Sequence, residues 1–376
     1  MSATSSRAGQ GPLHSLRVVE LAGIGPGPHT CMMLADLGAE VVRVQRPDVV
    51  PLTGLPVEED AQCRGRTIVE ADLKNPDDTT DVRALIDAAD ILVEGFRPGV
   101  TERLGLGPKE CLQRNPRLIY ARVSGWGQDG PWAQRAGHDL NYLAVSGVLD
   151  NIGEPGRAPV PPLNLIADFG GGSMLAALGI VAALVERMRS GHGQIVDAAM
   201  LDGTVQLAQL QWTHWAAGTW TTGRGRNFLD GSAPFYTTYA CADGRYMAVA
   251  PIERPFYLRM IELLGLQERK LPAQWDQEGW PSLKETLAET FATRTQSAWA
   301  KIFQDEDACV TPVLTYQDAL DHPHVRARGV LDESGTRVQA RPAPRFSRSA
   351  TPVPPAPRRL PLAAVVEDWQ SQQRGT

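Results

Sequence analysis

The sequence predicts an α/β protein that has a parallel sheet and a second, smaller α/β or α+β domain. Runs rich in valine and leucine alternate with helix-like runs through residues 16–127, and this alternation is typical of βαβ units in a parallel sheet. The composition changes to a tryptophan-rich helical stretch between 200 and 230. A length of 376 residues allows two domains, or one large domain that carries an insertion.

The first βαβ unit opens the chain. Residues 16–23 predict a strand, the Gly/Pro loop 23–28 follows, and residues 29–38 predict a helix closed by Gly38. Residues 39–47 predict the next strand. The loop lacks the G-x-G-x-x-G spacing of a phosphate cradle, and its two prolines remove amides that such a cradle uses. We therefore interpret it as a tight turn between strand and helix.

The same alternation returns twice. A helix followed by a strand is predicted within 81–96 and again within 108–127. We expect strands to end near Arg46, Glu94 and Ser124. In open α/β sheets ligands bind at the loops that follow such strand ends.

The second half of the chain predicts a different arrangement of secondary structure. Residues 233–255 predict two alternating strands joined by "ADGR", which is a hairpin signal. Helical segments follow to about 305, so residues 233–320 predict a separate small domain. Residues 341–362 are rich in proline and predict an extended strap rather than a packed element.

Composition excludes several classes of protein. A formal charge of −6 argues against nucleic acid or membrane binding by charge alone. The apolar run 174–185 is too short to span a bilayer and predicts a buried helix. The first fifteen residues contain no secretory signal, so we expect a cytoplasmic protein. The cysteines, which form no CxxC pair, predict reduced thiols and no metal site: Cys31, Cys63, Cys111, Cys241 and Cys309.

Three titratable residues stand at junctions between loops and apolar runs. Asp168 precedes three glycines and then an apolar helix, where the helix dipole stabilises a carboxylate and free amides can receive an oxyanion. A simple N-cap is the alternative for Asp168. His138 opens an apolar run and Glu253 ends a strand of the small domain, and each is compatible with a structural role.

A group of basic residues follows predicted strand ends or turns. Arg46, Lys74, Arg97 and Arg103 occupy these positions. Together they can form a cationic rim for the phosphates of a nucleotide-like ligand. Solvated surface charge is the alternative interpretation.

Ordered blocks along nearly the whole chain resemble the type III CoA-transferase (CaiB/BaiF) family. They include "LRVVELAGIGPGPH", "DLGAEVVRVQRP", "VEGFRPGVTERLGLGP", "AGHDLNY", "PPLNLIADFGGGSM" and "DGRYMAVAPIE". The triplet "GHD" at 137–139 and the absence of a glycine run in the small-domain region are similar to the racemase branch of that family.

The resemblance implies a fold and an assembly. The large domain would be Rossmann-like and built from both chain ends, with a small domain inserted between long linkers. It implies the large domain over 1–200, a linker over 201–232, the small domain over 233–320, and the return linker with the last part of the large domain over 321–376. Two chains would interlock as a homodimer, with each active site between the large domain of one chain and the small domain of the other.

The resemblance also implies site residues. The catalytic residues would be His138, Asp168 and Glu253, with Asp139 as a positioning neighbour rather than a base. The contacts to CoA implied by the family are at Arg46, Ala71, Asp72, Leu73, Lys74, Gly95, Phe96, Arg97, Arg103, Gly137, Asp139, Leu140, Asn141 and Tyr142. CoA is then part of the substrate, and no other cofactor and no metal are expected.

The implied reaction inverts the α-carbon of 2-methylacyl-CoA thioesters by two-base proton transfer through an enolate. One group removes the α-proton and the other returns a proton to the opposite face, so two groups must flank the carbon. Asp168 needs a raised pKa for this work, and amides near the glycines are candidate donors to the enolate. The alternatives are a CoA-transferase in which Asp168 forms an acyl intermediate, and a silent CoA-binding protein.

Overall fold

A computed structural model describes residues 11–48, 54–333 and 337–374. The chain divides into two compact units. The first contains residues 1–146, 163–208 and 329–376, and the second contains 147–162 and 209–328. Each unit is described by itself.

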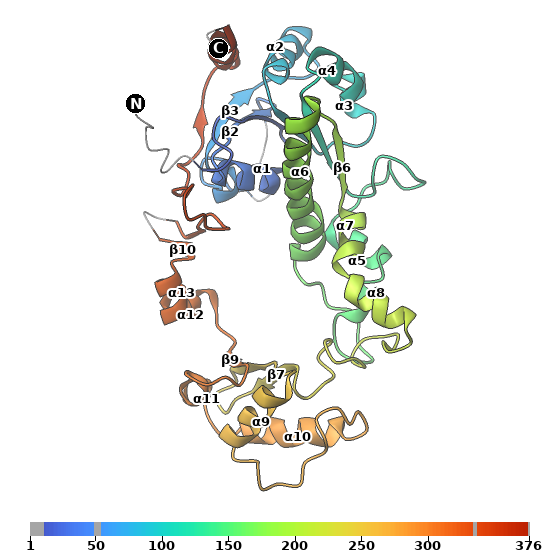
Figure 1. The fold of residues 1–376 in the computed structure, drawn as a ribbon, viewed down its shortest axis with the longest axis vertical. Helices are drawn as coiled ribbons and strands as arrows, with labels where there is room; N and C mark the ends of the chain where they lie inside the picture. The colour runs from blue at the N-terminus through green and yellow to red at the C-terminus, as the bar shows by residue number, and fades with distance from the viewer. Residues whose placement is uncertain (1–10, 49–53, 334–336, 375–376) are drawn as a thin grey trace. The chain divides into compact units, whose positions relative to one another are not determined.

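The first unit is built on a seven-stranded sheet in the order β12-β3-β2-β1-β4-β5-β6. Its strands β2, β3 and β6 are labelled in Figure 1. Every neighbouring pair is parallel. The order β3-β2-β1-β4-β5-β6 is that of a doubly wound nucleotide-binding sheet. The predicted parallel α/β sheet is therefore confirmed. Its strands are β1 (Arg17–Leu21), β2 (Glu40–Gln45), β3 (Arg66–Glu70), β4 (Ile91–Glu94), β5 (Ile119–Ser124), β6 (Ile195–Ala199) and β12 (Arg358–Arg359).

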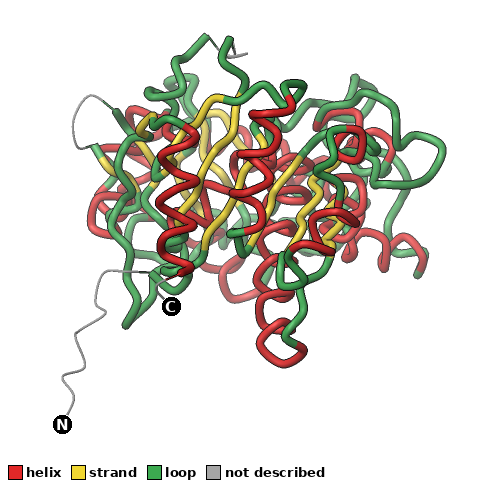
Figure 2. Tube along the Cα trace, turned by 90° about the horizontal axis from the view of Figure 1, so that it is seen from above, coloured by secondary structure: helices red, strands yellow, loops and turns green. Residues whose placement is uncertain are grey.

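Helices cover both faces of this sheet (Figure 2). On one face Val19, Val42 and Leu92 pack against α2 (Pro76–Asp87), α4 (Pro108–Arg114) and α14 (Leu362–Arg374). On the other face Val18 and Val41 pack against α1 (Pro26–Asp36) and α6 (Leu175–Ser190). Strand residues alternate between the two faces because successive side chains of a strand point in opposite directions. The result is a three-layer sandwich whose strands are buried on both sides.

Both ends of the chain contribute to this unit. The strand β12 pairs with β3, and α14 buries Trp369 completely. The indole Nε1 of Trp369 donates to Glu40 at 2.9 Å, and the Arg17 guanidinium lies 5.1 Å from the Trp369 ring centroid. The prediction of an extended strap was therefore wrong at its C-terminal end, where residues 358–359 join the sheet.

A buried ion cluster crosses three strands of the sheet. Glu20, on β1, is 1% exposed and accepts from Arg43 of β2 and, at 2.9 Å, from Arg66 of β3. Burial alone would raise the pKa of Glu20, but the two guanidinium groups outweigh it and the pKa is lowered. These three side chains connect β1, β2 and β3 through buried ion pairs.

The apolar helix is longer and more exposed than predicted. The π-helix η3 (Leu165–Met174) runs directly into α6, and the combined helix Leu165–Ser190 is 26 residues long with a mean hydropathy of 1.7. By length and composition alone it could cross a membrane, a test that core helices of soluble proteins also pass. About 33% of its most apolar window is buried. The expectations of a short run and a buried helix were therefore wrong, and one apolar face lies open in the isolated chain.

The second unit has its own core and a three-stranded antiparallel sheet in the order β7-β8-β9. The predicted hairpin is present, with β7 (Thr237–Ala240) paired to β8 (Tyr246–Val249). Trp280 and Phe291 are buried in this core. Its other main elements are α8 (Gln209–Ala216), α9 (Arg254–Leu263), α10 (Trp280–Phe291), α11 (Gln296–Phe303) and β9 (Val310–Pro312).

Residues 147–162 belong to this second unit, whereas the expected bounds place them in the large domain. The reason is a set of hydrogen bonds between residues 150–157 and residues 220–224. Arg224 donates to Asp150 at 2.7 Å and to the carbonyl of Arg157, and the Trp220 indole donates to Asn151 at 3.0 Å.

The remaining elements are short connections. They are η1 (Ala61–Cys63), α3 (Val100–Arg103), α5 (Asp139–Val145), η2 (Leu149–Asn151), α7 (Met200–Leu207), α12 (Tyr316–Asp321), α13 (Pro323–Arg328), β10 (Leu331–Asp332) and β11 (Gln339–Ala340).

Candidate active site

The candidate site lies at the carboxyl edge of the parallel sheet. The strand order reverses between β1 and β4, and ligands of doubly wound folds bind in the crevice outside that point. The loop after β1 reaches this edge at Gly25, whose φ is +68°. A methyl group at Gly25 would lie 3.3 Å from Oδ2 of Asp168, so the loop passes directly against that carboxylate. Asp168 thus stands beside the loop that leaves β1.

Asp168 is held by its neighbours on two sides. The Asp139 carboxylate, 4% exposed, accepts from the backbone amides of Ala167 at 2.7 Å and Asp168 at 2.8 Å through its Oδ2 atom. The side-chain amide of Asn164, one turn earlier on the chain, donates to Oδ2 of Asp168 at 3.3 Å. The backbone and the carboxylate of Asp168 are therefore both fixed.

The environment raises the pKa of Asp168, as its expected role requires. Partial burial is the largest cause, and the Asp139 charge adds to it, whereas the Asn164 hydrogen bond and the nearby His138 act in the opposite direction. A raised pKa brings a carboxyl group closer to the range in which it both takes and gives a proton.

His138 stands at the first turn of α5. Its backbone amide donates to Oδ1 of Asn141 at 3.0 Å, and the Tyr142 hydroxyl donates to the carbonyl of Gly137 at 2.6 Å. The His138 side chain is exposed, and it is close enough to Asp168 to interact with it electrostatically. His138 and Asp168 therefore belong to the same unit, and their joint action stays a prediction.

The shape of η3 follows from its glycines. A methyl group at Gly171 would lie 2.8 Å from the backbone nitrogen of Thr204, and one at Gly203 would lie 1.9 Å from the carbonyl oxygen of Gly171. Both positions need glycine, because η3 and α7 cross here backbone against backbone. This crossing sets the depth at which Asp168 sits.

Glu253 belongs to the second unit, where it precedes α9 as its N-cap. Its side chain is exposed, and it lies near Cys309, whose pKa is raised by burial first and by Glu253 in addition. The side-chain amide of Gln274 donates to the carbonyls of Pro251 and Ile252 and so fixes the loop before it. The expected pairing of Glu253 with His138 stays a prediction.

The basic residues predicted as a rim follow β2, β3 and β4, and β1 lies between β2 and β4 in the sheet. Arg46 follows β2, Lys74 follows β3, and Arg97 and Arg103 follow β4. All four side chains are exposed, and within the described parts of the chain none is recorded in an ion pair. Arg43, Arg66 and Arg122, by contrast, are buried in ion pairs. The exposed cations are therefore free to meet an anionic ligand.

The other residues expected to contact CoA differ in exposure. Ala71, Asp139 and Tyr142 are buried, so Ala71 has no side chain surface to offer and Asp139 is already engaged by two amides. Those with exposed or half-buried positions are Asp72, Leu73, Gly95, Phe96, Gly137, Leu140 and Asn141. The individual contacts stay predictions.

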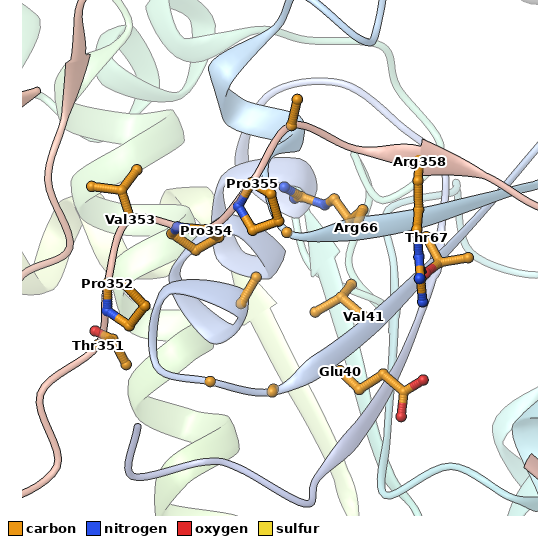
Figure 3. A pocket seen from close by; sticks show the side chains of 15 residues that line it. Glu40, Val41, Arg66, Thr67, Thr351, Pro352, Val353, Pro354, Pro355 and Arg358 are labelled. Carbon is orange, nitrogen blue, oxygen red and sulfur yellow. Dashed lines mark hydrogen bonds between the residues drawn. The ribbon is translucent and has the colours of Figure 1, made fainter. Parts of the chain in front are cut away.

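A hollow of about 430 Å³ lies at the opposite, amino edge of the sheet (Figure 3). Glu40 and Arg66, at the starts of β2 and β3, and the proline strap 351–355 line it. Arg66 is already paired with Glu20. None of the predicted site residues lines this hollow, and it plays no part in the candidate site.

Sequence reasoning missed Asn164, His29 and the π-helical form of the segment around Asp168. His29 was predicted as the first residue of a helix over 29–38, whereas α1 begins at Pro26 and carries His29 in its first turn. Proline is favoured at the first position of a helix, a signal that could have placed the start there. Within the described ranges no group of three or more His, Cys, Asp or Glu side chains could hold a metal ion.

The fold and this site define a class. The family model described as CoA-transferase family III matches residues 13–362. The chain therefore belongs to CoA-transferase family III.

Known relatives within the class are similar over most of the chain. The chain is 50% identical over 350 residues to alpha-methylacyl-CoA racemase of Mus musculus, covering 93% of this chain and 90% of the relative. It is 47% identical over 351 residues to alpha-methylacyl-CoA racemase of Homo sapiens, with the same coverage of 93% and 90%. The crystal structure of a CaiB/BaiF family protein from Brucella suis matches with a TM-score of 0.81 and 27% identity, covering 96% of this chain and 100% of that one.

Proposed function

We propose that this protein is a racemase that inverts the α-carbon of 2-methylacyl-CoA thioesters. The observation that supports the proposal is that His138 precedes Asp139, whose carboxylate accepts from the Asp168 amide at 2.8 Å, in a chain 50% identical over 350 residues to alpha-methylacyl-CoA racemase of Mus musculus. An imidazole and a carboxyl group are the two acid–base groups that a proton exchange at one carbon needs.

Asp168 and His138 take opposite roles in the two directions. When one of them removes the α-proton, the other returns a proton to the opposite face of the planar enolate. The thioester acidifies the α-proton, so this chemistry asks for no cofactor beyond the CoA of the substrate. The raised pKa of Asp168 lets its carboxyl group serve as the acid in one direction and as the base in the other.

The structure limits which amides can serve as donors to the enolate. Amides near the glycines stay candidates, but those of Ala167 and Asp168 donate to Asp139. These two amides position Asp168 instead. Stabilisation of the enolate must come from other donors, because an amide spent on a buried carboxylate is not free for a developing charge.

The substrate handle is CoA, and the basic rim supports this assignment. Arg46, Lys74, Arg97 and Arg103 follow the ends of β2, β3 and β4, and their cationic groups are exposed. Guanidinium and ammonium groups that are not paired with a carboxylate can form charge-assisted hydrogen bonds to phosphates. Glu253 is assigned to orient His138, as the family resemblance implies.

The working form is proposed to be a homodimer, and an exposed stripe on the long helix supports it. The stripe consists of Met174, Leu178, Val181, Val185 and Met188. Its spacing of four and three residues repeats as in helices that pack against another helix. Met188 is 85% exposed and Leu178 is 63% exposed. A contiguous apolar surface of this kind is typical of a protein–protein interface. A second copy of this chain is the proposed cover.

Exchange of the α-hydrogen in heavy water tests the reaction. Each enantiomer of a 2-methylacyl-CoA is incubated separately with wild type, His138→Ala and Asp168→Ala, and deuterium at the α-carbon is followed by mass spectrometry. We expect exchange in wild type without any free acid. Each variant should lose abstraction from one enantiomer more severely than from the other, because each base serves one face.

Two outcomes would favour the alternatives. Transfer of CoA to a labelled free acid, without solvent deuterium at the α-carbon, would indicate a CoA-transferase in which Asp168 attacks the thioester. Binding of acyl-CoA with neither CoA transfer nor α-hydrogen exchange would indicate a CoA-binding protein without catalytic activity. Equal losses for both enantiomers would contradict the two-base assignment.

A further inference from the structure

We infer that His29 is a positioning residue for Asp168, acting through the π-helix η3. The observation behind it is a cluster of contacts between the first turn of α1 and η3. The His29 ring stacks on Phe169, the residue after Asp168, with ring centroids 4.4 Å apart and planes 25° apart. The Nδ1 atom of His29 lies 2.7 Å from Oγ of Ser173.

The direction of these hydrogen bonds can be worked out. A serine hydroxyl has one hydrogen, and Ser173 donates it to the carbonyl of Phe169 at 2.8 Å. At the contact with His29 the Ser173 oxygen must therefore accept, so Nδ1 of His29 carries the proton. Burial, together with Arg64 and Arg66, lowers the pKa of His29, although Asp36 opposes the shift. A neutral ring protonated at Nδ1 fits this arrangement.

Two further contacts surround the same segment. Thr30, fully buried, directs its hydroxyl to the carbonyls of Pro26 at 2.8 Å and of Ser173 at 3.4 Å. Gly25 lies against the Asp168 carboxylate itself. The start of α1 therefore contacts η3 at Asp168 and at the residues that follow it, and His29 contacts both Phe169 and Ser173.

The consequence follows from the geometry of the helix. A π-helix holds more residues per turn than an α-helix and is a rare conformation that needs support. If the segment relaxed to an α-helix, each side chain would rotate by a fraction of a turn around the axis, since an α-helix advances about 100° per residue. Asp168 would then leave its place beside Gly25. Holding η3 in its observed form is the role we assign to His29.

The inference rests on the proposed function for its kinetic consequence only. Four variants test it. His29→Phe keeps a stacked ring but loses the Nδ1 proton, and His29→Asn keeps a donor but loses the ring. Ser173→Ala removes the hydroxyl that connects His29 to the Phe169 carbonyl, and the fourth variant combines His29→Phe with Ser173→Ala. His192→Phe, at an exposed histidine, is the matched control. Amide hydrogen exchange of residues 165–174 and steady-state α-proton exchange are measured for each.

We expect His29→Phe to speed amide exchange in residues 165–174 and to lower kcat about tenfold with KM unchanged, the size of one lost buried hydrogen bond. The loss should be greater for the enantiomer that Asp168→Ala impairs more. His29→Asn should recover part of the rate. The double variant should be no worse than either single one, because both break the same connection.

Unchanged amide exchange and kcat in His29→Phe, or additive losses in the double variant, would overturn the inference. A rise in KM alone would do the same, because it would place His29 in binding. Should wild type show no α-proton exchange, the proposed function fails, while amide exchange still decides whether His29 holds η3. If His29→Phe does not fold, His29→Asn and Ser173→Ala carry the same comparison.

Discussion

At the scale of single residues, Asp139 acts on Asp168 through one oxygen atom. Its Oδ2 accepts two consecutive amides, those of Ala167 and Asp168, while its Oδ1 is buried without a recorded hydrogen-bond partner. Two amide donors stabilise the negative charge of Asp139, and this charge contributes to the raised pKa of Asp168. In the proposed mechanism His138 is one of the two acid–base groups, and its sequence neighbour Asp139 raises the pKa of the other, Asp168.

Asp139→Asn tests this relation. The amide oxygen of asparagine can still accept from the two backbone amides, but the negative charge is gone, so the pKa of Asp168 should fall. The rate of proton removal by Asp168 rises as pH passes its pKa, and we expect that limb of the pH profile to move to lower pH. The profile of α-proton exchange, recorded for the enantiomer that depends on Asp168 as base, measures it.

Asp129→Asn is the control, because Asp129 is an exposed aspartate in the segment that precedes α5. It should leave the profile in place. A limb that does not move in Asp139→Asn would show that the Asp139 charge does not reach Asp168.

At the scale of elements, the helix η3, which carries Asp168, crosses α7 at close range. Gly171 and Gly203 approach so closely that neither can carry a methyl group without a backbone shift. Glycine inside a helix destabilises it through conformational entropy, but here it allows the backbones of η3 and α7 to approach each other closely.

Gly203→Ala should destabilise the protein by about 3 kcal/mol or more, because its methyl group meets a backbone carbonyl rather than a movable side chain. Urea unfolding measures the change. Gly27→Ala, also in a helix, is the matched control: a methyl group there has nothing within 4 Å, so its stability should be equal or greater. Similar stabilities for the two variants would argue against the close crossing.

The elements that the sequence predicted well are those whose pattern is local. The strands β1, β2, β4 and β5 and the hairpin β7–β8 have the expected alternation or apolar runs. The strand β3, with a charged residue at each end, and the two-residue β12 were missed because their pairing partners define them. The π-helix was missed for a related reason: contacts with α1 and α7, not its own sequence, hold it.

At the scale of the whole molecule, the candidate site is assembled from segments far apart in the sequence. His138 and Asp168 could be selected as a pair only by family resemblance, since each alone fits a structural role. The exposure of the basic rim residues at one edge could be predicted from the sequence, because parallel strands end at one edge and the segments after β2, β3 and β4 each carry a cation, whereas their binding role stays a prediction. Glu253 lies in the other unit, so its partner could not be derived from local pattern.

The rim predicts a salt-dependent affinity for CoA. Arg97→Ala should weaken CoA binding about tenfold, the worth of one charge-assisted hydrogen bond to phosphate, and the difference from wild type should shrink as salt rises. Isothermal titration at two salt concentrations measures it. Arg189→Ala, at the far end of α6, removes an exposed arginine from the opposite edge and should bind CoA like wild type. Equal effects of the two substitutions would contradict a localised rim.

The stripe on the long helix makes a prediction about assembly. We expect wild type to sediment as a dimer, because a row of apolar side chains that includes Leu178 and Met188 would otherwise face water. Leu178→Glu combined with Met188→Glu should shift the protein to monomer at micromolar concentration, since an unpaired carboxylate in an apolar interface costs several kcal/mol. Sedimentation velocity measures this, and Arg189→Glu, next to Met188 but outside the stripe, should remain dimeric.

The assembly prediction also separates two ways of covering the helix. A dimer that survives both glutamates would mean that copies meet through another surface and that the stripe needs a different cover. A wild-type monomer would contradict the homodimer itself. If the double variant becomes monomeric and also loses α-proton exchange while circular dichroism shows it folded, the site requires the second copy. That result would connect the open face of α6 to the chemistry at the start of η3, one continuous helix serving assembly along its length and proton transfer at its end.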